Sequence, residues 1–231
     1  VADPRVVENP DVINVITYKE LRELAYMGAS VLHEDAIFPV RTAGIPINIK
    51  NTNKPEDAGT MIVSDDHDFE DESNAYTITG IAGRKGFSTI NIEKAMMNSE
   101  MGFGMKVLRV LADNNVSFEH MPSGIDTMSI TVDTNSLNPV REKVLSQLRK
   151  EVNPDHLEIE DGIALLAVVG RRMKNTRGTV ARIFASMAHA RINVKMIDQG
   201  SSELNVIIGV SENDLNEAIR RIYDMFISSE K

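Results

Sequence analysis

A pattern of glycine and apolar residues that occurs twice is the strongest constraint on how this chain folds. Residues 102–132 contain a glycine turn, an amphipathic helix, a short strand, a second turn with glycine and another strand, and residues 178–208 repeat that order without a gap. Because the same order of elements rarely arises twice by chance, we interpret the two stretches as copies of one structural unit. The alternative is a pair of unrelated βαβ units that share a common periodicity.

The residues around the first copy complete a four-stranded unit. Their pattern predicts strands at residues 88–92, 117–121, 127–132 and 157–160, and helices at residues 103–114 and 139–150. The glycines in Gly83-Arg84-Lys85-Gly86 predict a break between the first of these strands and an earlier one at residues 76–82. The resulting order, βαββαβ, is that of a ferredoxin-like fold.

The second copy lacks one strand in linear order. Its pattern predicts strands at residues 163–169, 193–197 and 204–210, a helix at residues 178–190, and a last helix that starts at a capping box of Ser211 and Asp214. We infer that the spare strand at residues 76–82 crosses over to complete this unit. The predicted class is α+β, with a first unit at residues 87–161 inserted in a second unit that comprises residues 76–86 and 162–231.

Residues 1–63 have the pattern of the end of a separate α/β domain. Thr17 and Glu20 predict a capping box at the start of one helix, and Gly44 suits the end of a second helix at about residues 34–42. Two short strands follow, which is too little structure for a core of its own. Residues 64–75 are acidic and polar, and we interpret them as a solvated linker, because nothing in their spacing sets the geometry of the alternative, a metal site.

The composition argues against several classes of function. A net charge of −9 disfavours nucleic acid as the main partner, and the absence of cysteine excludes disulfides and thiolate chemistry. The apolar runs are far shorter than the roughly 20 residues of a membrane span, so we expect no membrane partner and a cytoplasmic location. The chain begins at Val1 without an initiator methionine, and we expect it to be a piece of a longer protein.

Several motifs in residues 1–63 resemble the end of the catalytic domain of aspartate kinases. They are Asp3-Pro4-Arg5, Ile16-Thr17-Tyr18-Lys19-Glu20, Gly28-Ala29-Ser30-Val31-Leu32-His33 and Gly44-Ile45-Pro46-Ile47. The duplicated unit resembles the paired ACT domains that follow the catalytic domain in this family. The resemblance implies a parent enzyme that phosphorylates the β-carboxylate of L-aspartate with Mg-ATP, the first step towards lysine, threonine and methionine. It also implies that the ACT pair mediates feedback inhibition by sensing an amino acid, usually lysine and sometimes threonine.

The residues that carry catalysis in this family have no counterpart in the chain. We therefore predict no catalytic residue, metal ligand or cofactor site here, and we expect the chain alone to be inactive. Arg5 matches the arginine of the family motif that approaches phosphates, and the alternative is a loop arginine in an ion pair. Ser30 occupies a position where the family often has a lysine near ATP, and His33 fits the same motif but also suits a structural role at a helix end.

The start of the first repeat helix has the features of an amino-acid receptor. Gly102, Phe103 and Gly104 open this helix, and free backbone N–H groups there can hold a carboxylate. Glu119 on the next strand can accept the ammonium group of the same ligand, although a solvated strand residue is the alternative. The resemblance adds Met97 to these four residues, and together they form the effector site that we expect for L-lysine or L-threonine.

The second copy differs at the positions that matter for binding. Lys195 corresponds to Glu119, and Thr179 corresponds to Phe103. Because a lysine side chain would repel the ammonium group of a ligand, we predict one effector site per chain, in the first unit or where it meets the first unit of a partner chain. Side-by-side pairing of ACT units would cover exposed edge strands, which predicts a homodimer. Two other functions stay open, a ligand-free ACT dimerisation module and an intact catalytic aspartate kinase subunit.

Two further clusters have structural interpretations. We expect the methionines Met96, Met97, Met101 and Met105 to fill the core rather than to bind a metal. The basic turn at residues 171–174 is expected to be solvated, with a contact to the catalytic domain as the alternative.

Overall fold

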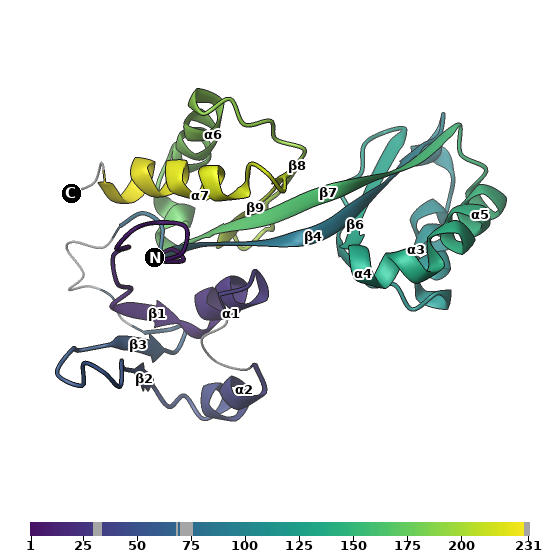
Figure 1. Cartoon of the computed structure of the whole chain (residues 1–231). Coiled ribbons are helices and arrows are strands. Elements are labelled where there is room, and N and C mark those ends of the chain that lie inside the picture. The colour runs from purple at the N-terminus through teal and green to yellow at the C-terminus, as the bar shows by residue number, and fades with distance from the viewer. Residues whose placement is uncertain (30–33, 68, 70–75, 229–231) are drawn as a thin grey trace. The chain divides into compact units, whose positions relative to one another are not determined.

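The computed structural model describes residues 1–29, 34–67, 69 and 76–228, which form two compact units (Figure 1). Unit 1 comprises Val1–Arg84 together with Leu165–Lys231, and unit 2 comprises Lys85–Ala164. Ser30, His33 and most of the acidic segment lie outside the described residues. Among the described helices, none is long and apolar enough to cross a membrane.

The N-terminal part of unit 1 is a small three-stranded sheet with two helices (Figure 1). Its strand order is β1 (Val15–Thr17), β3 (Thr60–Val63) and β2 (Ile47–Ile49), with β1 parallel and β2 antiparallel to β3. Helix α1 (Tyr18–Tyr26) packs against β1 and β3, and helix α2 (Glu34–Thr42) follows.

Both predicted helix caps in this part are confirmed. The Thr17 hydroxyl accepts a hydrogen bond from the Glu20 N–H, and the Glu20 carboxylate accepts one from the Thr17 N–H in return. After α2, Gly44 adopts a left-handed φ of 66° and its N–H donates to the Arg41 carbonyl, which closes the helix end.

The start of the acidic segment is more ordered than a solvated linker. The Asp65 carboxylate accepts the N–H of Lys19 in the first turn of α1 and forms ion pairs with the side chains of Lys19 and Arg41. The Phe69 ring lies under the guanidinium group of Arg171, 3.7 Å from its central carbon. The described part of this segment is therefore tied to its own unit by charge at one point and by an aromatic contact at another.

The C-terminal part of unit 1 is a sheet covered by two helices (Figure 1). The strand order is β4 (Gly80–Glu93), β7 (His156–Val169), β9 (Asn205–Ser211) and β8 (Met196–Asp198). Helices α6 (Thr179–His189) and α7 (Leu215–Tyr223) pack on each other. Helix α7 continues into the π-helical turn η4 (Asp224–Ser228). The predicted capping box is wrong here, because Asp214 precedes α7 without a side-chain cap and the Ser211 carbonyl accepts the Asp214 N–H instead.

Unit 2 has the strand order β5, β6, β4 and β7, with helices on one face. Its elements are β5 (Phe118–His120), β6 (Thr127–Asp133), α3 (Phe103–Asp113), α4 (Thr134–Leu137), α5 (Arg141–Val152) and the 3₁₀ turns η1 (Met97–Ser99) and η2 (Asn138–Val140). The register pairs Ile90 with Ile130 and Ile92 with Met128, and these apolar side chains form one core with Val107, Leu111 and Leu148 of the helices.

Two strands are longer than the sequence pattern predicts. The predicted pairs of short strands are each one strand of 14 residues, β4 (Gly80–Glu93) and β7 (His156–Val169). A Cβ atom on Gly83 would lie 2.6 Å from Leu215 Cδ1, so this glycine allows α7 to pack closely rather than ending a strand. Sheet neighbours on both sides of β4 and β7 supply the pairing that overrides the local turn signal.

Gly170, directly after β7, is predicted to tolerate no side chain. A Cβ atom there would lie 2.8 Å from Ile78 Cα and 2.9 Å from the Thr77 carbonyl oxygen, both of which are backbone atoms. We expect Gly170→Ala to lower the free energy of unfolding by about 1–3 kcal/mol in chemical denaturation, because the backbone must shift. Gly200→Ala is the matched control, since its Cβ would meet nothing closer than 4.0 Å. Equal stabilities of the two variants would contradict this close approach.

Candidate functional site

A sharp backbone turn leads from η1 into helix α3 in unit 2. Gly102 is the N-cap residue, with a left-handed φ of 78°, and no side chain caps the helix. The Phe103 N–H donates to the Glu100 carbonyl at 3.2 Å. This N–H group is therefore not available to bind the carboxylate of a ligand. The N–H groups of Gly104 and Met105 belong to the first turn, where a helix supplies no acceptor of its own.

Three charged side chains stand beside this turn. The Glu100 carboxylate accepts hydrogen bonds from Lys94 Nζ at 2.5 Å and from Lys106 Nζ at 2.6 Å. The hydrogen bonds from Lys106 and then Lys94 hold the pKa of Glu100 below its usual range. Lys94 Nζ also donates to the Val152 carbonyl and lies 5.7 Å from the centre of the Phe103 ring. Two ammonium groups and one carboxylate leave this cluster with a net positive charge next to the helix start.

The β5–β6 loop runs alongside the same turn. The Ile125 carbonyl accepts the Asn98 N–H at 3.1 Å, and the Asp126 carbonyl accepts the Lys94 N–H at 2.9 Å. Within the loop, the Gly124 N–H donates to the Thr127 carbonyl. The loop is therefore fixed to η1 and to the end of β4 by backbone hydrogen bonds, which no sequence motif indicated.

Glu119 occupies a bulge on the edge strand β5. Phe118 pairs with Val132 and His120 pairs with the adjacent Thr131, so the register shifts at Glu119. Bulges re-aim a side chain and interrupt the pairing of an edge strand. Glu119 is partly buried, and its position at an irregular point of an edge strand distinguishes it from a regular solvated strand residue.

The other predicted site residues are either buried in the hydrophobic core of unit 2 or placed at the surface of the turn. The side chains of Met97 and Phe103 are 5% and 4% exposed and belong to the hydrophobic core of unit 2, so only their backbone can face a ligand. Gly104 lies over β6, where a Cβ atom on it would be 3.7 Å from Met128 Cε. Gly104 thus lies beside Met128 of β6, whereas Glu119 lies opposite Thr131 and Val132 of the same strand, so the two predicted parts of the site are separate points along β6.

The expectation that the methionine group fills the core is wrong for three of its four members. Met97 is buried, but the exposed fractions of Met96, Met101 and Met105 are 71%, 95% and 59%. Ile125 on the adjoining loop is 70% exposed. Their apolar side chains predicted burial, but Met96 and Met101 lie on the irregular backbone before α3 rather than on its buried face. Apolar side chains therefore surround the turn on its exposed side.

The corresponding turn in unit 1 has different surroundings. Gly178 starts α6 with a left-handed φ of 83°, as Gly102 does for α3, but Thr179 is buried and its hydroxyl donates to the Thr176 carbonyl. Lys195 precedes β8 and is exposed, and its N–H donates to the Gly209 carbonyl. Unit 1 thus carries a cation directly before its edge strand β8, whereas unit 2 carries a carboxylate within its edge strand β5.

Arg5 lies in an exposed loop and is paired locally. Its Nη2 atom is 2.7 Å from Asp3 Oδ2, and its side chain is 86% exposed. This geometry corresponds to the ion-pair alternative. The described residues contain no group of three or more acidic or histidine side chains that could hold a metal ion.

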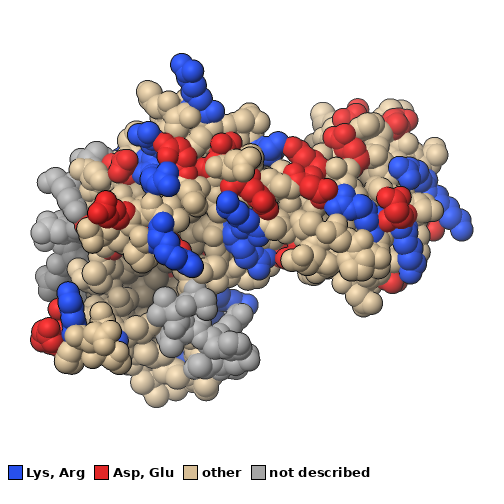
Figure 2. Space-filling model, viewed as in Figure 1, with Lys and Arg blue, Asp and Glu red and all other residues tan. Residues whose placement is uncertain are grey.

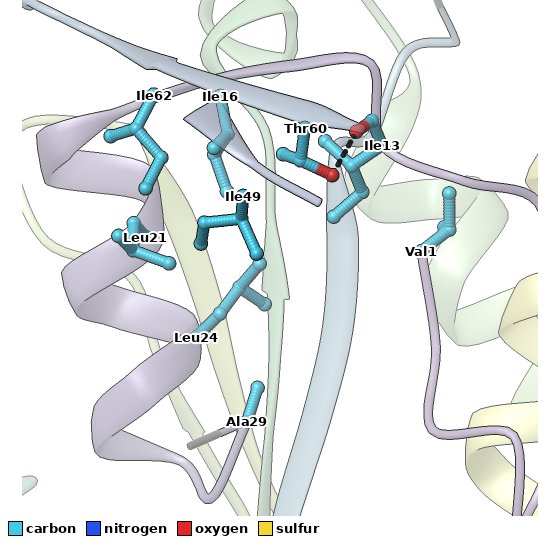
Figure 3. A pocket seen from close by; sticks show the side chains of 9 residues that line it. All are labelled: Val1, Ile13, Ile16, Leu21, Leu24, Ala29, Ile49, Thr60 and Ile62. Carbon is cyan, nitrogen blue, oxygen red and sulfur yellow. Dashed lines mark hydrogen bonds between the residues drawn. The ribbon is translucent and has the colours of Figure 1, made fainter. Parts of the chain in front are cut away.

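An apolar hollow of about 200 Å³ lies between the small sheet and α1 in unit 1 (Figure 3). It is lined by Val1, Ile13, Ile16, Leu21, Leu24, Ala29, Ile49, Thr60 and Ile62. The Thr60 hydroxyl donates to the Ile13 carbonyl, so the one polar side chain in the lining is already engaged. None of the lining side chains carries a charge that could pair with a charged ligand.

Charged side chains of both signs are interspersed over the surface that Figure 2 shows.

Comparisons with known proteins match both parts of the chain. Residues 1–51 match the amino acid kinase family, and residues 166–226 match the ACT domain. Aspartokinase 3 from Bacillus subtilis is 39% identical over 98% of this chain and 49% of its own length. The crystal structure of aspartate kinase from Clostridium acetobutylicum is 52% identical, covers 97% of this chain and 51% of that chain, and has a TM-score of 0.92. The chain thus spans about half the length of these relatives.

A more distant structure shares the fold. E. coli aspartokinase III, solved in complex with lysine and aspartate in its T-state, is 24% identical, covers 98% of this chain and 49% of that chain, and has a TM-score of 0.74. At this level of identity the likeness supports the fold alone.

The Glu100 ion pairs predict a specific titration. Because its pKa is lowered, Glu100 keeps both lysines bound above the ordinary glutamate pKa of 4.5 and releases them as the pH falls through its lowered pKa. We expect Lys106→Met to raise the pKa of Glu100 towards 4.5 in a carboxyl NMR titration. Lys150→Met, on the exposed face of α5, is the control and should leave the titration unchanged. A Glu100 pKa that is the same in both variants would show that the Lys106 contact does not form in solution.

Proposed function

The chain corresponds to the C-terminal part of aspartate kinases, with the end of an amino acid kinase domain followed by an ACT region, and on that premise we propose that its unit 2 binds L-lysine as an allosteric effector. Binding would feed back on the ATP-dependent phosphorylation of L-aspartate by the whole enzyme. The turn from Gly102 into α3, with its net positive cluster and the bulged Glu119, is the observation that carries this proposal.

The carboxylate of the effector is assigned to the start of α3. The N–H groups of Gly104 and Met105 and the helix dipole favour an anion there, and Lys94 and Lys106 outnumber Glu100. Gly104 has no side chain, so a ligand can approach the backbone closely. The Phe103 and Met97 side chains support this backbone from the core.

The α-ammonium group of the effector is assigned to Glu119. A carboxylate on an edge-strand bulge can accept charge-assisted hydrogen bonds from a cation. L-Lysine is preferred to L-threonine as the effector because the long apolar stem of lysine would cover exposed methionine side chains beside the turn. The E. coli relative was solved with lysine, but its low identity leaves the choice to these residues.

The proposal places one effector site in each chain and pairs two chains through unit 2. In unit 1, Lys195 stands where a ligand ammonium would need an acceptor, and Thr179 is occupied. The exposed apolar residues around the unit 2 turn, together with the edge strand β5, form a surface that a second copy would cover. The ligand would then lie close to the dimer interface.

Catalysis is assigned to the part of the enzyme outside this chain. ATP and magnesium would be required by the whole kinase, and Arg5, the nucleotide-site candidate of this chain, is paired with Asp3. The chain alone should therefore form no aspartyl phosphate. The remaining candidate is an ACT dimerisation module without a ligand, which the same exposed apolar surface would also suit.

Calorimetry with L-lysine tests the effector site. We expect saturable binding with one lysine per chain, weakened roughly tenfold by Glu119→Gln because a charge-assisted hydrogen bond is lost. Gly104→Ala should fold normally, since its Cβ meets only Met128 Cε at 3.7 Å, yet weaken binding by obstructing the carboxylate. Lys195→Gln in the second copy is the control and should bind as the wild type does. Absence of heat across millimolar lysine would reject lysine, and a panel that includes threonine would then separate another effector from a ligand-free module.

Sedimentation velocity tests the dimer. Met101 is 95% exposed, so Met101→Asp should leave the fold of a single chain intact while it weakens self-association, because a charge would be buried in the interface. Val12→Asp, at an exposed position in the N-terminal part, is the matched control. The proposal would fail if the wild-type chain sedimented as a monomer or if both variants behaved alike.

A further inference from the structure

The Glu20 side chain in α1 is a fully buried carboxylate in unit 1. It belongs to the capping box of its own helix, where the N–H and the hydroxyl of Thr17 both donate to Oε2. A capping glutamate is ordinarily solvated, and one carboxylate needs no further partner to cap a helix. Burying a carboxylate without additional hydrogen-bond partners would destabilise the fold, so the buried Glu20 needs further contacts from hydrogen-bond donors.

Those contacts come from the ends of the two long strands. The Thr79 hydroxyl, directly before β4, donates to Glu20 Oε1 at 2.6 Å. The Arg171 N–H, two residues after β7, donates to the same oxygen at 2.9 Å, and the Arg171 guanidinium lies 3.2 Å from Oε2. Burial alone would raise the pKa of Glu20, but hydrogen bonds from Thr79, Thr17 and Arg171 outweigh it and keep the pKa below its usual value.

The surroundings hold these groups in one arrangement. The Arg171 guanidinium is stacked on the Phe69 ring, which fixes the side of Arg171 that does not face Glu20. The Thr79 N–H donates to the Val169 carbonyl, so the two strand ends are joined to each other next to the carboxylate. The close approach of Gly170 to the backbone of Thr77 and Ile78 leaves this part of the chain no room to shift.

We propose that Glu20 is a positioning residue that fastens the start of β4 and the end of β7 to helix α1, so that these three segments open and move as one body. The basic turn at residues 171–174 thus contacts the kinase fragment through its first residue. Strands β4 and β7 also run through unit 2, where the proposed effector site lies. In its regulatory consequence the inference rests on the proposed function: a change in these strands on effector binding would reach α1 of the kinase domain through Glu20.

Hydrogen exchange followed by NMR on the 231-residue chain tests the joint. The N–H groups of Thr17 and Arg171 donate directly to Glu20, so they report on α1 and on the end of β7. In Glu20→Gln we expect both amides to exchange at least about tenfold faster, the size that a buried hydrogen bond to a charged group implies. Amides of the unit 2 core should keep their wild-type rates.

Glu23→Gln is the matched control, because Glu23 lies on the same helix and contacts Asn205 of β9 rather than the ends of β4 and β7. It should leave the Thr17 and Arg171 amides unchanged. If Glu20→Gln does not fold, Thr79→Val removes one hydroxyl at nearly equal volume and should still speed exchange at Thr79 and Arg171. Loss of protection at Thr17 while Arg171 keeps its wild-type rate, or equal effects of the Glu20 and Glu23 variants, would overturn the proposal.

Saturating L-lysine separates this inference from the proposed function. If lysine binds, Glu20→Gln should keep the wild-type affinity in calorimetry but lose the lysine-induced change in exchange at Thr17. A Thr17 response that is equal in the variant and the wild type would show that Glu20 does not transmit it. If lysine does not bind, the proposed effector fails, and the comparison of Glu20→Gln with Glu23→Gln without ligand still decides whether the joint exists.

Discussion

The pairing of β4 with β7 is the constraint on which the rest of this structure depends, because each strand contributes to both compact units. Neither unit can form its sheet without residues from both strands. This requirement explains why Gly83, which looks like a turn signal, lies within a strand, and why Gly170 must be a glycine beside the backbone of residues 77–79. The local conformational preference of one residue contributes about 1 kcal/mol to stability. Hydrogen bonding to two neighbouring strands and burial contribute at every residue of a central strand, so together they exceed it.

The same constraint gives the buried Glu20 its importance. A carboxylate that only capped α1 would gain little from burial. The hydrogen bonds from Thr79 and Arg171 offset the cost of burying the Glu20 charge. They also join three segments that are far apart in sequence. The pKa of Glu20 is held low by these donors, so the joint is charged at neutral pH and weakens only in acid. Directional bonds at the Glu20 carboxylate therefore connect the kinase fragment to the ACT part of unit 1, alongside hydrogen bonds such as those from Asn205 to Glu23 and from Arg220 to the Val6 carbonyl.

The helix-opening turns of the two units have similar backbones and different chemistry. Gly102 and Gly178 both start a helix in the left-handed conformation, and the helices pack on their sheets in the same order of elements. Around the first turn are two lysines, a shared glutamate and exposed methionines, and the edge strand of the same unit carries a bulged glutamate. Around the second, the threonine hydroxyl is engaged and an exposed lysine replaces the glutamate. Sequence divergence at a few positions thus accounts for our assignment of the effector to unit 2 alone.

The sequence by itself determined the α+β class, the repeated unit, the Thr17–Glu20 capping box and the end of α2 at Gly44, because each depends on residues within a few positions of one another. It also pointed to Gly102, Gly104 and Glu119. The tertiary structure alone decided the continuity of β4 and β7, the exposure of Met101 and Met105, and the pairing of Lys94 and Lys106 with Glu100. It alone also placed Arg171 against Glu20. These features join residues that are distant in the chain or depend on which side of an element is covered, and no local periodicity encodes either.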